Sequence, residues 1–393
     1  MTATTGAQAA GRATVPWSWY ADPSILGLER ERIFRRAWQY AGHLGELQGP
    51  GSYFASATGP VPIVITLDDD GILRGFLNVC RHRGAIVATD ARRRGTLQCP
   101  YHAWTYDLDG CLRAAPRSGE DCAFDATRLG LVPVSVGTWG PFVFANPDPA
   151  ADSLTDALGD LPGVVAAHGL DIDALRINRR VHYELRSNWK IGLENYLECY
   201  HCPVNHPGLV DVIDERRLRL VAEGLRTSQF APVHPRSLDG RGPIDARGEV
   251  ACAQNHLWFP TLKFNVLPGH PNLSIGPLWP TGPETCAGYL DYWFGDSADD
   301  EWIDAVFALD GQIGAEDEAL VAAAQRGSST GIIERGWVLG GAEALIAHFQ
   351  DYVRDRLGLD GRGHMSSRTG TAAGSASTGQ TQAITPSTEH HGS

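Results

Sequence analysis

The sequence predicts an α+β protein in which a small all-β domain precedes a larger domain of mixed helices and strands. Residues 41–149 contain short β-type runs separated by turn residues. Residues 150–361 instead alternate apolar, strand-like runs with helical patterns. With 393 residues, the chain is long enough for two domains and a large core.

The first 40 residues form a separate segment that we expect to pack against the larger domain. Within it, residues 24–38 have the pattern of an amphipathic helix, with Ser24 as a possible N-cap. The start of the chain lacks the apolar core of a secretory signal.

The small domain should consist of short strands joined by turns such as Asp109-Gly110. Its predicted strands are Val61–Leu67, Ile72–Val79, Thr96–Gln98, Trp104–Tyr106 and Val132–Val136.

The larger domain combines strands and helices, and a polar tail follows it. Its predicted strands are Val181–Leu185, Leu257–Val266 and Tyr289–Trp293, and its predicted helices are 301–309, 317–326 and 342–357. The last helix should stop at Gly358. Residues 362–393 have almost no large apolar side chains, so we expect this tail to be disordered.

Two cysteines and two histidines in the small domain predict an iron–sulfur cluster. Cys80 and His82 stand in one short segment, and Cys99 and His102 stand in the next. A Rieske [2Fe–2S] centre needs two cysteines on one iron and two histidines on the other. Structural zinc is the alternative, because it also accepts two Cys and two His. Zinc fingers usually pair Cys with Cys, however, whereas each segment here carries one Cys and one His.

A second group of candidate ligands lies in Asn188–Pro207. Apolar residues at helical spacing predict a buried helix that Pro203 should end just after His201. His206 then enters from the following turn, so the two imidazoles could converge on one metal. Alone, such a pair is weak evidence, because unrelated core histidines are common.

Together these motifs resemble the large subunits of Rieske non-heme iron oxygenases. The resemblance covers about residues 17–360. It implies a Rieske domain beside a helix-grip-like catalytic domain with an antiparallel sheet, commonly assembled as a trimer. It also implies that His201, His206 and Asp317 hold an Fe(II) with open positions for O₂. Asp310, Glu316 and Glu318 are the rival carboxylates.

The resemblance also assigns roles around the iron. Glu198 takes the position of the carboxylate that bridges to a Rieske histidine of the neighbouring subunit, although many relatives have aspartate there. Asn195 lies in the same motif and is a candidate catalytic residue. The alternative for Glu198 is an ordinary helix-surface salt bridge.

The chain has no nicotinamide or flavin motif, so the electrons must come from elsewhere. A separate NAD(P)H-dependent reductase, with or without a ferredoxin, is therefore the expected partner, together with O₂ and a small organic substrate. The residues Arg92-Arg93-Arg94 between the cluster loops are either a docking patch or a solvated loop.

The substrate is predicted only by resemblance. The segment Asn188–Pro207 is most similar to the branch that oxidises choline, glycine betaine and carnitine. A quaternary ammonium favours an aromatic box. The candidate aromatics are Trp258, Phe259, Trp279, Tyr289, Tyr292, Trp293 and Phe294, although a single aromatic residue in a strand is more often part of the core. Alternatives are an aromatic or natural-product substrate, or a non-catalytic Rieske electron carrier.

Composition excludes other classes of function. A net charge of −13 disfavours nucleic-acid or anionic-membrane partners, and no stretch is apolar enough to span a bilayer. Of the eight cysteines, two belong to the cluster motif. The other six are scattered along the sequence, which suggests a reducing cytoplasm. Cys199 and Cys202 form a C-x-x-C that encloses the candidate ligand His201, so we expect both to be packing residues and not a redox motif.

Overall fold

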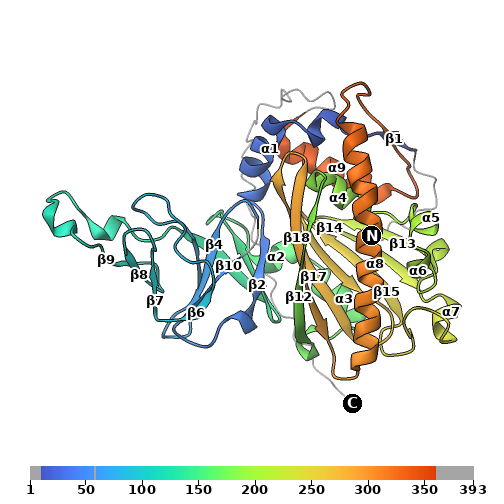
Figure 1. Ribbon diagram of the computed structural model, residues 1–393, viewed down its shortest axis with the longest axis horizontal. Coiled ribbons are helices and arrows are strands. Elements are labelled where there is room, and N and C mark those ends of the chain that lie inside the picture. Colours follow the sequence, from blue (N-terminus) through green and yellow to red (C-terminus); the bar gives the residue numbers. More distant parts are fainter. Residues whose placement is uncertain (1–9, 57–58, 360–393) are drawn as a thin grey trace, which may run out of the picture.

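The computed structural model describes residues 10–56 and 59–359. It shows a small β domain at one side of a larger domain that is built on a second sheet (Figure 1). The expected tail at 362–393 lies outside the described residues. None of the helices within the described ranges is long and apolar enough to cross a membrane.

The small domain is built from two antiparallel sheets. A seven-stranded sheet has the order β2-β11-β10-β5-β4-β3-β6, and a three-stranded sheet has the order β7-β8-β9. The first contains β2 (Gln39–His43), β3 (Ser52–Ser56), β4 (Ile63–Leu67), β5 (Leu73–Leu77), β6 (Ala91–Arg93), β10 (Pro133–Trp139) and β11 (Phe142–Asn146). The second contains β7 (Thr96–Gln98), β8 (Thr105–Asp107) and β9 (Leu112–Ala114). Each predicted strand of this domain overlaps an observed one.

The larger domain has one antiparallel sheet in the order β12-β18-β17-β16-β15-β14-β13. Its strands are β12 (Arg176–Leu185), β13 (Arg219–Glu223), β14 (Arg226–Pro232), β15 (Cys252–Trp258), β16 (Leu262–Val266), β17 (Asn272–Gly282) and β18 (Thr285–Phe294). The prediction of a single strand at Leu257–Val266 is wrong. The chain turns between β15 and β16, and these two strands pair antiparallel.

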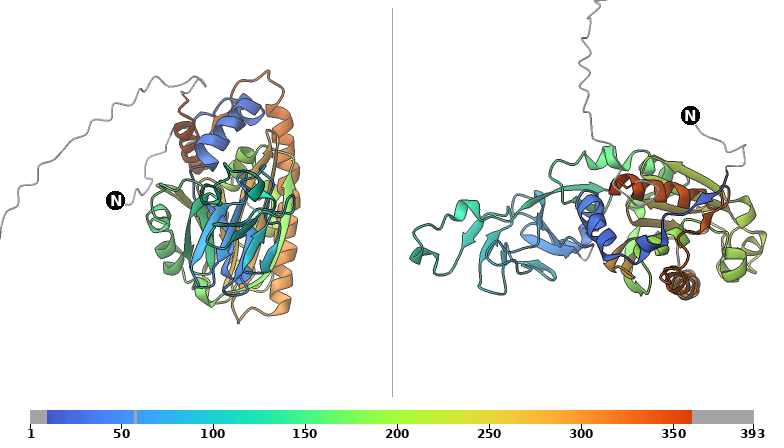
Figure 2. Two further views of the ribbon diagram at one scale, coloured as in Figure 1. Left: turned by 90° about the vertical axis from the view of Figure 1, so that its left-hand side faces the viewer. Right: turned by 90° about the horizontal axis from the view of Figure 1, so that it is seen from above.

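One long helix, α8 (Asp300–Ser328), runs beside this sheet (Figures 1 and 2). The sequence predicted two helices here and placed Asp317 at the start of the second. That prediction is wrong, because the helix continues through Gly311 and Gly314 and Asp317 lies well inside it. Helix α9 (Ala344–Leu357) ends as predicted at Gly358, which adopts the left-handed conformation.

Short helices complete the larger domain. They are α2 (Leu154–Leu158), α3 (Leu161–Ala167), α4 (Trp189–Tyr196), α5 (Cys202–Asn205), α6 (Pro207–Val210) and α7 (Pro235–Leu238). Helix α1 (Pro23–Glu29) passes into a π-helical turn at Arg30–Phe34. Its N-cap is Asp22, whose side chain accepts from the Ser24 N–H, so the predicted cap at Ser24 is wrong by two residues.

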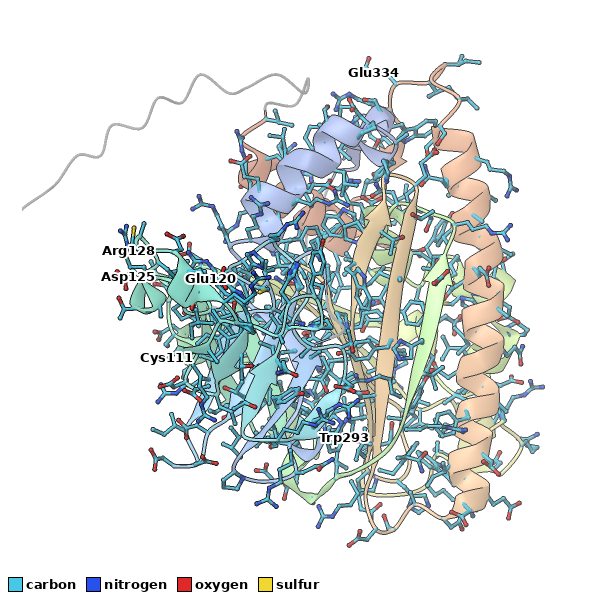
Figure 3. All side chains as sticks on the ribbon, turned by 60° about the vertical axis from the view of Figure 1, so that its left-hand side comes forward. Cys111, Glu120, Asp125, Arg128, Trp293 and Glu334 are labelled. Atoms are coloured by element: carbon cyan, nitrogen blue, oxygen red, sulfur yellow. A yellow bond between two sulfur atoms is a disulfide. The ribbon has the colours of Figure 1, made fainter. Side chains whose placement is uncertain are left out.

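Aromatic side chains join the two domains. Phe142 and His43 of the small domain contact Trp293 of β18, with ring centroids 5.4 Å and 5.2 Å away. Figure 3 labels Trp293 at this position. The Tyr40 hydroxyl also donates to buried Asp291 at 2.7 Å. This interface fixes the small domain against the outer face of the large sheet.

Candidate iron centres

The four predicted cluster ligands come together at the loops of the small domain. Cys80 lies beyond β5 and Cys99 follows β7, and both thiols are buried within hydrogen-bonding reach of each other. The Tyr106 hydroxyl lies 3.2 Å from the Cys80 sulfur, which ties the sulfur to β8. The imidazoles of His82 and His102 lie next to each other, with ring centroids 4.6 Å apart.

The surroundings of these side chains suit a Rieske cluster. His82 stacks on Trp104 with 4.8 Å between ring centroids, which fixes the orientation of the imidazole. The Nδ1 atom of His102 is buried and has no hydrogen-bond partner among the described residues. A buried imidazole nitrogen with a free lone pair fits an iron ligand.

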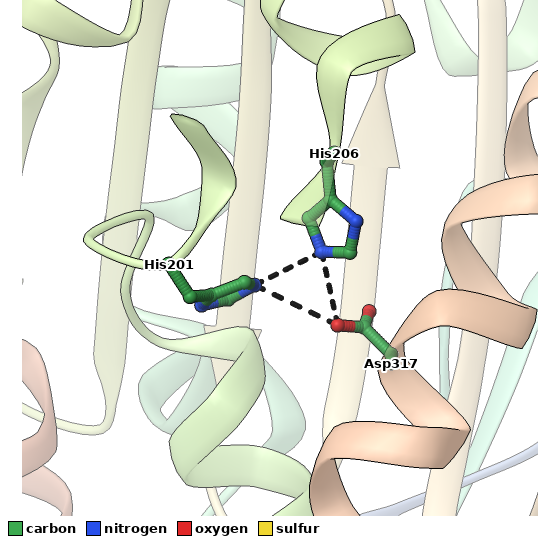
Figure 4. Close-up of side chains that lie close together, drawn as sticks. All are labelled: His201, His206 and Asp317. Carbon is green, nitrogen blue, oxygen red and sulfur yellow. Dashed lines mark hydrogen bonds and ion pairs between the residues drawn. The ribbon is translucent and has the colours of Figure 1, made fainter. Parts of the chain in front are cut away.

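His201, His206 and Asp317 converge on one point (Figure 4). The two Nε2 atoms of the histidines are 3.0 Å apart, and Oδ1 of Asp317 lies 3.0 Å from His206 Nε2 and 3.6 Å from His201 Nε2. Two neutral imidazoles and one carboxylate are the donor set of a non-heme Fe(II) site. The residues present therefore fit the predicted metal.

The local backbone differs from the prediction. Helix α4 ends at Tyr196, and a turn then leads to His201, which is the N-cap of α5. Pro203 lies in the first turn of α5, where proline's fixed φ and missing N–H are tolerated. Thus Pro203 starts a helix and does not end one. The two histidines project from opposite ends of α5, and this brings their rings together.

Each histidine has a carboxylate at Nδ1, the ring nitrogen that faces away from the three-residue group. Glu198 contacts Nδ1 of His201, and Glu316 lies 2.7 Å from Nδ1 of His206. Such partners fix the tautomer and orientation of a metal-binding histidine. Glu316 therefore lies outside the three-residue group. Glu198 lies in the turn after α4 and contacts His201. It is therefore not the ordinary helix-surface salt bridge that the sequence left as an alternative.

Asn195 is a further polar side chain at this site. Its Nδ2 atom donates to Oδ1 of Asp317 at 2.9 Å and lies 3.3 Å from His201 Nε2. Burial lowers the pKa of His201, but Asp317 and Glu198 outweigh that effect and raise it to about 9.

Cys199 and Cys202 form a disulfide, so their prediction as separate packing residues is wrong. The turn after α4 brings their Cα atoms to 4.9 Å, within the range that a disulfide can bridge. The bond spans the segment that carries His201.

A cavity of about 530 Å³ opens beside the three-residue group, between the large sheet and α8. Of the seven predicted aromatics, only Tyr292 and Phe294 line it. The others pack in the hydrophobic core, because alternate residues of a strand face opposite sides of the sheet: Trp258, Phe259, Trp279, Tyr289 and Trp293.

Several lining residues were missed from the sequence. They are Tyr183, Tyr196, Lys263 and Phe307. A signal existed for Lys263, which interrupts an otherwise apolar run. Asp310, which was considered as a metal ligand, lines the cavity too and bonds the Tyr292 hydroxyl instead.

A Rieske-type cluster domain joined to a catalytic domain with two histidines and one carboxylate defines the class of Rieske non-heme iron oxygenases. The family model of the Rieske [2Fe-2S] domain matches residues 37–133. The model of the ring hydroxylating alpha subunit (catalytic domain) matches residues 172–359.

Comparison with known proteins identifies the family. The chain is 31% identical to choline monooxygenase of Spinacia oleracea over 356 residues, which covers 88% of this chain and 78% of that protein. It is 30% identical to the carnitine monooxygenase oxygenase subunit of Escherichia coli (strain K12), with 86% and 92% covered. The chain therefore belongs to the family of Rieske oxygenase alpha subunits that includes these monooxygenases.

Solved structures agree with the observed fold. The quaternary ammonium Rieske monooxygenase CntA superposes with a TM-score of 0.78 at 28% identity, covering 88% of this chain and 96% of that chain. Naphthalene 1,2-dioxygenase from Rhodococcus sp. shares the fold at a TM-score of 0.69 and 22% identity, covering 88% and 94%. The chain is an oxidoreductase with a [2Fe–2S] Rieske domain and a catalytic domain of the type that holds a mononuclear iron.

Proposed function

We propose that this protein is a terminal oxygenase that hydroxylates a quaternary ammonium compound at a carbon beside the nitrogen, with oxidative N-dealkylation. The observation that carries this proposal is the charge of the cavity next to the three-residue group. Its carboxylates outnumber its single ammonium, so its potential favours a cation. Besides the carboxylates of the iron site, the lining carboxylates are Glu184, Asp310 and Glu318, and the ammonium is that of Lys263.

Aromatic rings give a cation further contacts. Tyr292 and Phe294 line the same cavity, and the faces of aromatic rings attract quaternary ammonium groups. Choline and carnitine, after which the related monooxygenases are named, are quaternary ammonium compounds. An uncharged aromatic substrate would gain nothing from the carboxylates.

The site residues divide into two groups in this proposal. Cys80, His82, Cys99 and His102 would hold the cluster, and His201, His206 and Asp317 would hold the iron. When bound, the iron would supply O₂ activation and the cluster would supply electrons.

The neighbouring side chains would position these ligands. Glu198 would orient His201 and, in an oligomer, face a cluster histidine of the next subunit. Asn195 would hold the Asp317 carboxylate through its 2.9 Å hydrogen bond. The cluster loops lie in the small domain and the iron site in the larger one (Figure 1), so a trimer that pairs subunits would bring the two centres together.

The electron donor would be a separate NAD(P)H-dependent reductase, with or without a ferredoxin. Its docking would involve the cluster end of the small domain, where Arg92 and Arg93 are exposed on the edge strand β6. A cytoplasmic enzyme with access to NAD(P)H is consistent with this requirement.

The test is product analysis with a surrogate reductase. Reconstituted protein would be supplied with NADH, O₂ and either choline, a trimethylammonium carboxylate or benzoate. We expect substrate-dependent NADH use and an aldehyde or demethylated amine from a quaternary ammonium compound. Hydroxylation of benzoate alone would contradict the proposal.

A further inference from the structure

The disulfide between Cys199 and Cys202 is a feature of the iron site that metal binding does not explain. The other six cysteines of the chain are free thiols, and two of them, Cys80 and Cys99, belong to the cluster motif. Disulfides are rare in the reducing cytoplasm, and those that occur there are usually transient, with a catalytic or redox-sensing role. A disulfide in the cytoplasmic enzyme proposed above therefore points to redox chemistry at this pair.

Both cysteines of the pair line the cavity beside the iron ligands. Within the described residues, no other cysteine lines it. Cys199 is half-buried, whereas Cys202 is only 3% exposed. A small oxidant that enters the cavity therefore reaches Cys199 more easily and finds the sulfur of Cys202 beside it.

The disulfide closes a short ring of backbone around His201. This residue lies between the two cysteines, at the end of the loop that joins α4 to α5, and points toward His206 and Asp317 (Figure 4). The N–H groups of Tyr200 and His201 both donate to one side chain, the carboxylate of Glu198. Without the covalent bond, the loop would depend on such hydrogen bonds alone, so its conformational freedom would rise.

We propose that Cys199 and Cys202 form a redox-active pair that hydrogen peroxide converts from dithiol to disulfide, and that the disulfide holds His201 in its ligand position. Hydrogen peroxide is the product when O₂ accepts two electrons and two protons and no substrate is oxidised. An oxygenase that lacks substrate therefore meets this oxidant in its own cavity. The proposal stands for any organic substrate, and it rests on the proposed function only in that His201 is an iron ligand.

The reaction balances with hydrogen peroxide as the oxidant. The Cys199 sulfur would attack one peroxide oxygen, so that an S–O bond forms, the O–O bond breaks and one water leaves with the thiol proton. The Cys202 sulfur would then attack the Cys199 sulfur, which forms the S–S bond and releases the second oxygen as water with the Cys202 proton. Two thiols and one peroxide thus give one disulfide and two waters, and the sulfurs supply both electrons. A cytoplasmic dithiol would restore the thiols by exchange.

The test is a count of oxidised cysteines in the full-length holoenzyme. The protein would be reduced, freed of reductant without O₂ and treated with an equimolar amount of hydrogen peroxide. Free thiols would then be alkylated, and peptide mass spectrometry would locate the disulfide. The variants are Cys199→Ser and Cys202→Ser, with Cys252→Ser as a control that removes a half-buried thiol outside the cavity. Cluster absorbance would verify that each variant is folded.

We expect the pair to be oxidised about tenfold or more faster than Cys252, because access from the cavity and a neighbouring thiol both favour the reaction. Cys202→Ser should stop at a sulfenic acid on Cys199, which dimedone traps. Cys199→Ser should leave Cys202 largely unreacted, and Cys252→Ser should form the disulfide like the wild type. Equal oxidation of Cys252 and the pair, or a pair that stays dithiol, would overturn the proposal.

Hydrogen–deuterium exchange tests whether the disulfide holds His201. The amides of Tyr200 and His201 should exchange about 3- to 10-fold faster in the dithiol form than in the disulfide form. Cys199→Ser should match the dithiol form, and Cys252→Ser should behave like the wild type in both states. The same exchange rate in both forms would show that the bond does not hold this loop, and that result would overturn the proposal.

Iron binding separates this inference from the proposed function. Fe(II) should leave the dithiol form faster than the disulfide form, because the loop that carries His201 is then less restrained. A wild-type protein that binds no Fe(II) at His201 in either form would contradict the proposed function. The thiol count and the amide exchange would still decide the redox pair, because neither measurement depends on this iron.

Discussion

At the scale of single residues, Glu316 shows how a neighbouring carboxylate can act without binding the metal. It lies next to Asp317 in the sequence, yet it points to Nδ1 of His206 and is also bonded by Gln312 at 2.8 Å. The sequence alone left Glu316 and Asp317 as rival ligands. Only the direction of each side chain on α8 separates them.

Replacement of Glu316 by Gln should therefore weaken iron binding without removing a ligand. We expect about 10- to 100-fold lower Fe(II) affinity, because His206 loses the carboxylate that orients it. Anaerobic Fe(II) competition titration measures this. Glu318→Gln, on the other side of Asp317, is the matched control and should bind Fe(II) normally; an equal effect of both variants would refute the role of Glu316.

Glu194 is a half-buried acid of α4, and its ionisation should make the stability of the fold depend on pH. Burial raises its pKa to about 7 from an ordinary 4.5, although Gln350 and Tyr20 donate hydrogen bonds to it. The folded protein therefore keeps a proton that the unfolded chain releases above about pH 4.5. Stability from this group is present below that pH and is lost as pH rises to about 7.

Glu194→Gln removes the ionisation but keeps the shape. Between pH 5 and pH 8 we expect the variant to gain up to about 3 kcal/mol of unfolding free energy relative to the wild type. Thermal unfolding at a series of pH values measures the difference. Parallel curves for the two proteins would show that Glu194 titrates normally in the fold.

At the scale of elements, the sequence predicted the strands better than the helices. Turn residues bound the short strands of the small domain, so their positions followed from local signals. Helix α8 was divided because Gly311 and Gly314 interrupt its apolar pattern and disfavour helix. Both glycines line the cavity, so tertiary packing and the need for space outweigh local preference.

The iron site was predictable only in part, because local sequence signals reveal some of its residues and not others. The motif that contains His201 and His206 lies within one short segment, whereas Lys263 and Tyr183 come from separate strands. Their meeting depends on strand order, which no local pattern specifies. Most of the aromatic residues predicted to line the cavity do not line it, mainly because the sequence does not show which face of the sheet each side chain occupies.

Gln325 connects α8, which carries Asp317, to the start of α4, which carries Asn195. Its side chain accepts from the Asn188 N–H at 2.7 Å at the start of α4 and donates to Tyr20 and Glu284 from α8. Gln325→Met should cost about 1–3 kcal/mol, because a buried N–H loses its partner. Chemical denaturation measures the loss. Exposed Arg326→Met is the control, and equal stability of the two variants would contradict the role of Gln325.

At the scale of the whole molecule, the two centres lie in different domains, and in the proposed function neighbouring subunits cooperate. Asp317→Ala should remove the iron site of one chain, and Cys99→Ser the cluster of another. Each variant alone should be inactive. Mixed and reassembled oligomers should recover activity, because an intact cluster can then serve an intact iron site on its neighbour.

Recovery is measured as product formed per total chain after co-refolding or co-expression. A mixture that stays inactive, while size measurements show mixed oligomers, would mean that both centres must be intact within one chain. In that case Glu198 could not act across a subunit boundary.

The central claim is that this chain holds a Rieske cluster and a separate mononuclear iron at His201, His206 and Asp317. Its most direct test is the iron and acid-labile sulfide content of the wild type and of Asp317→Ala. We predict about three iron atoms and about two sulfides per chain in the wild type, and about two of each in the variant. Zinc without sulfide in the wild type, or an unchanged iron content in Asp317→Ala, would contradict the claim.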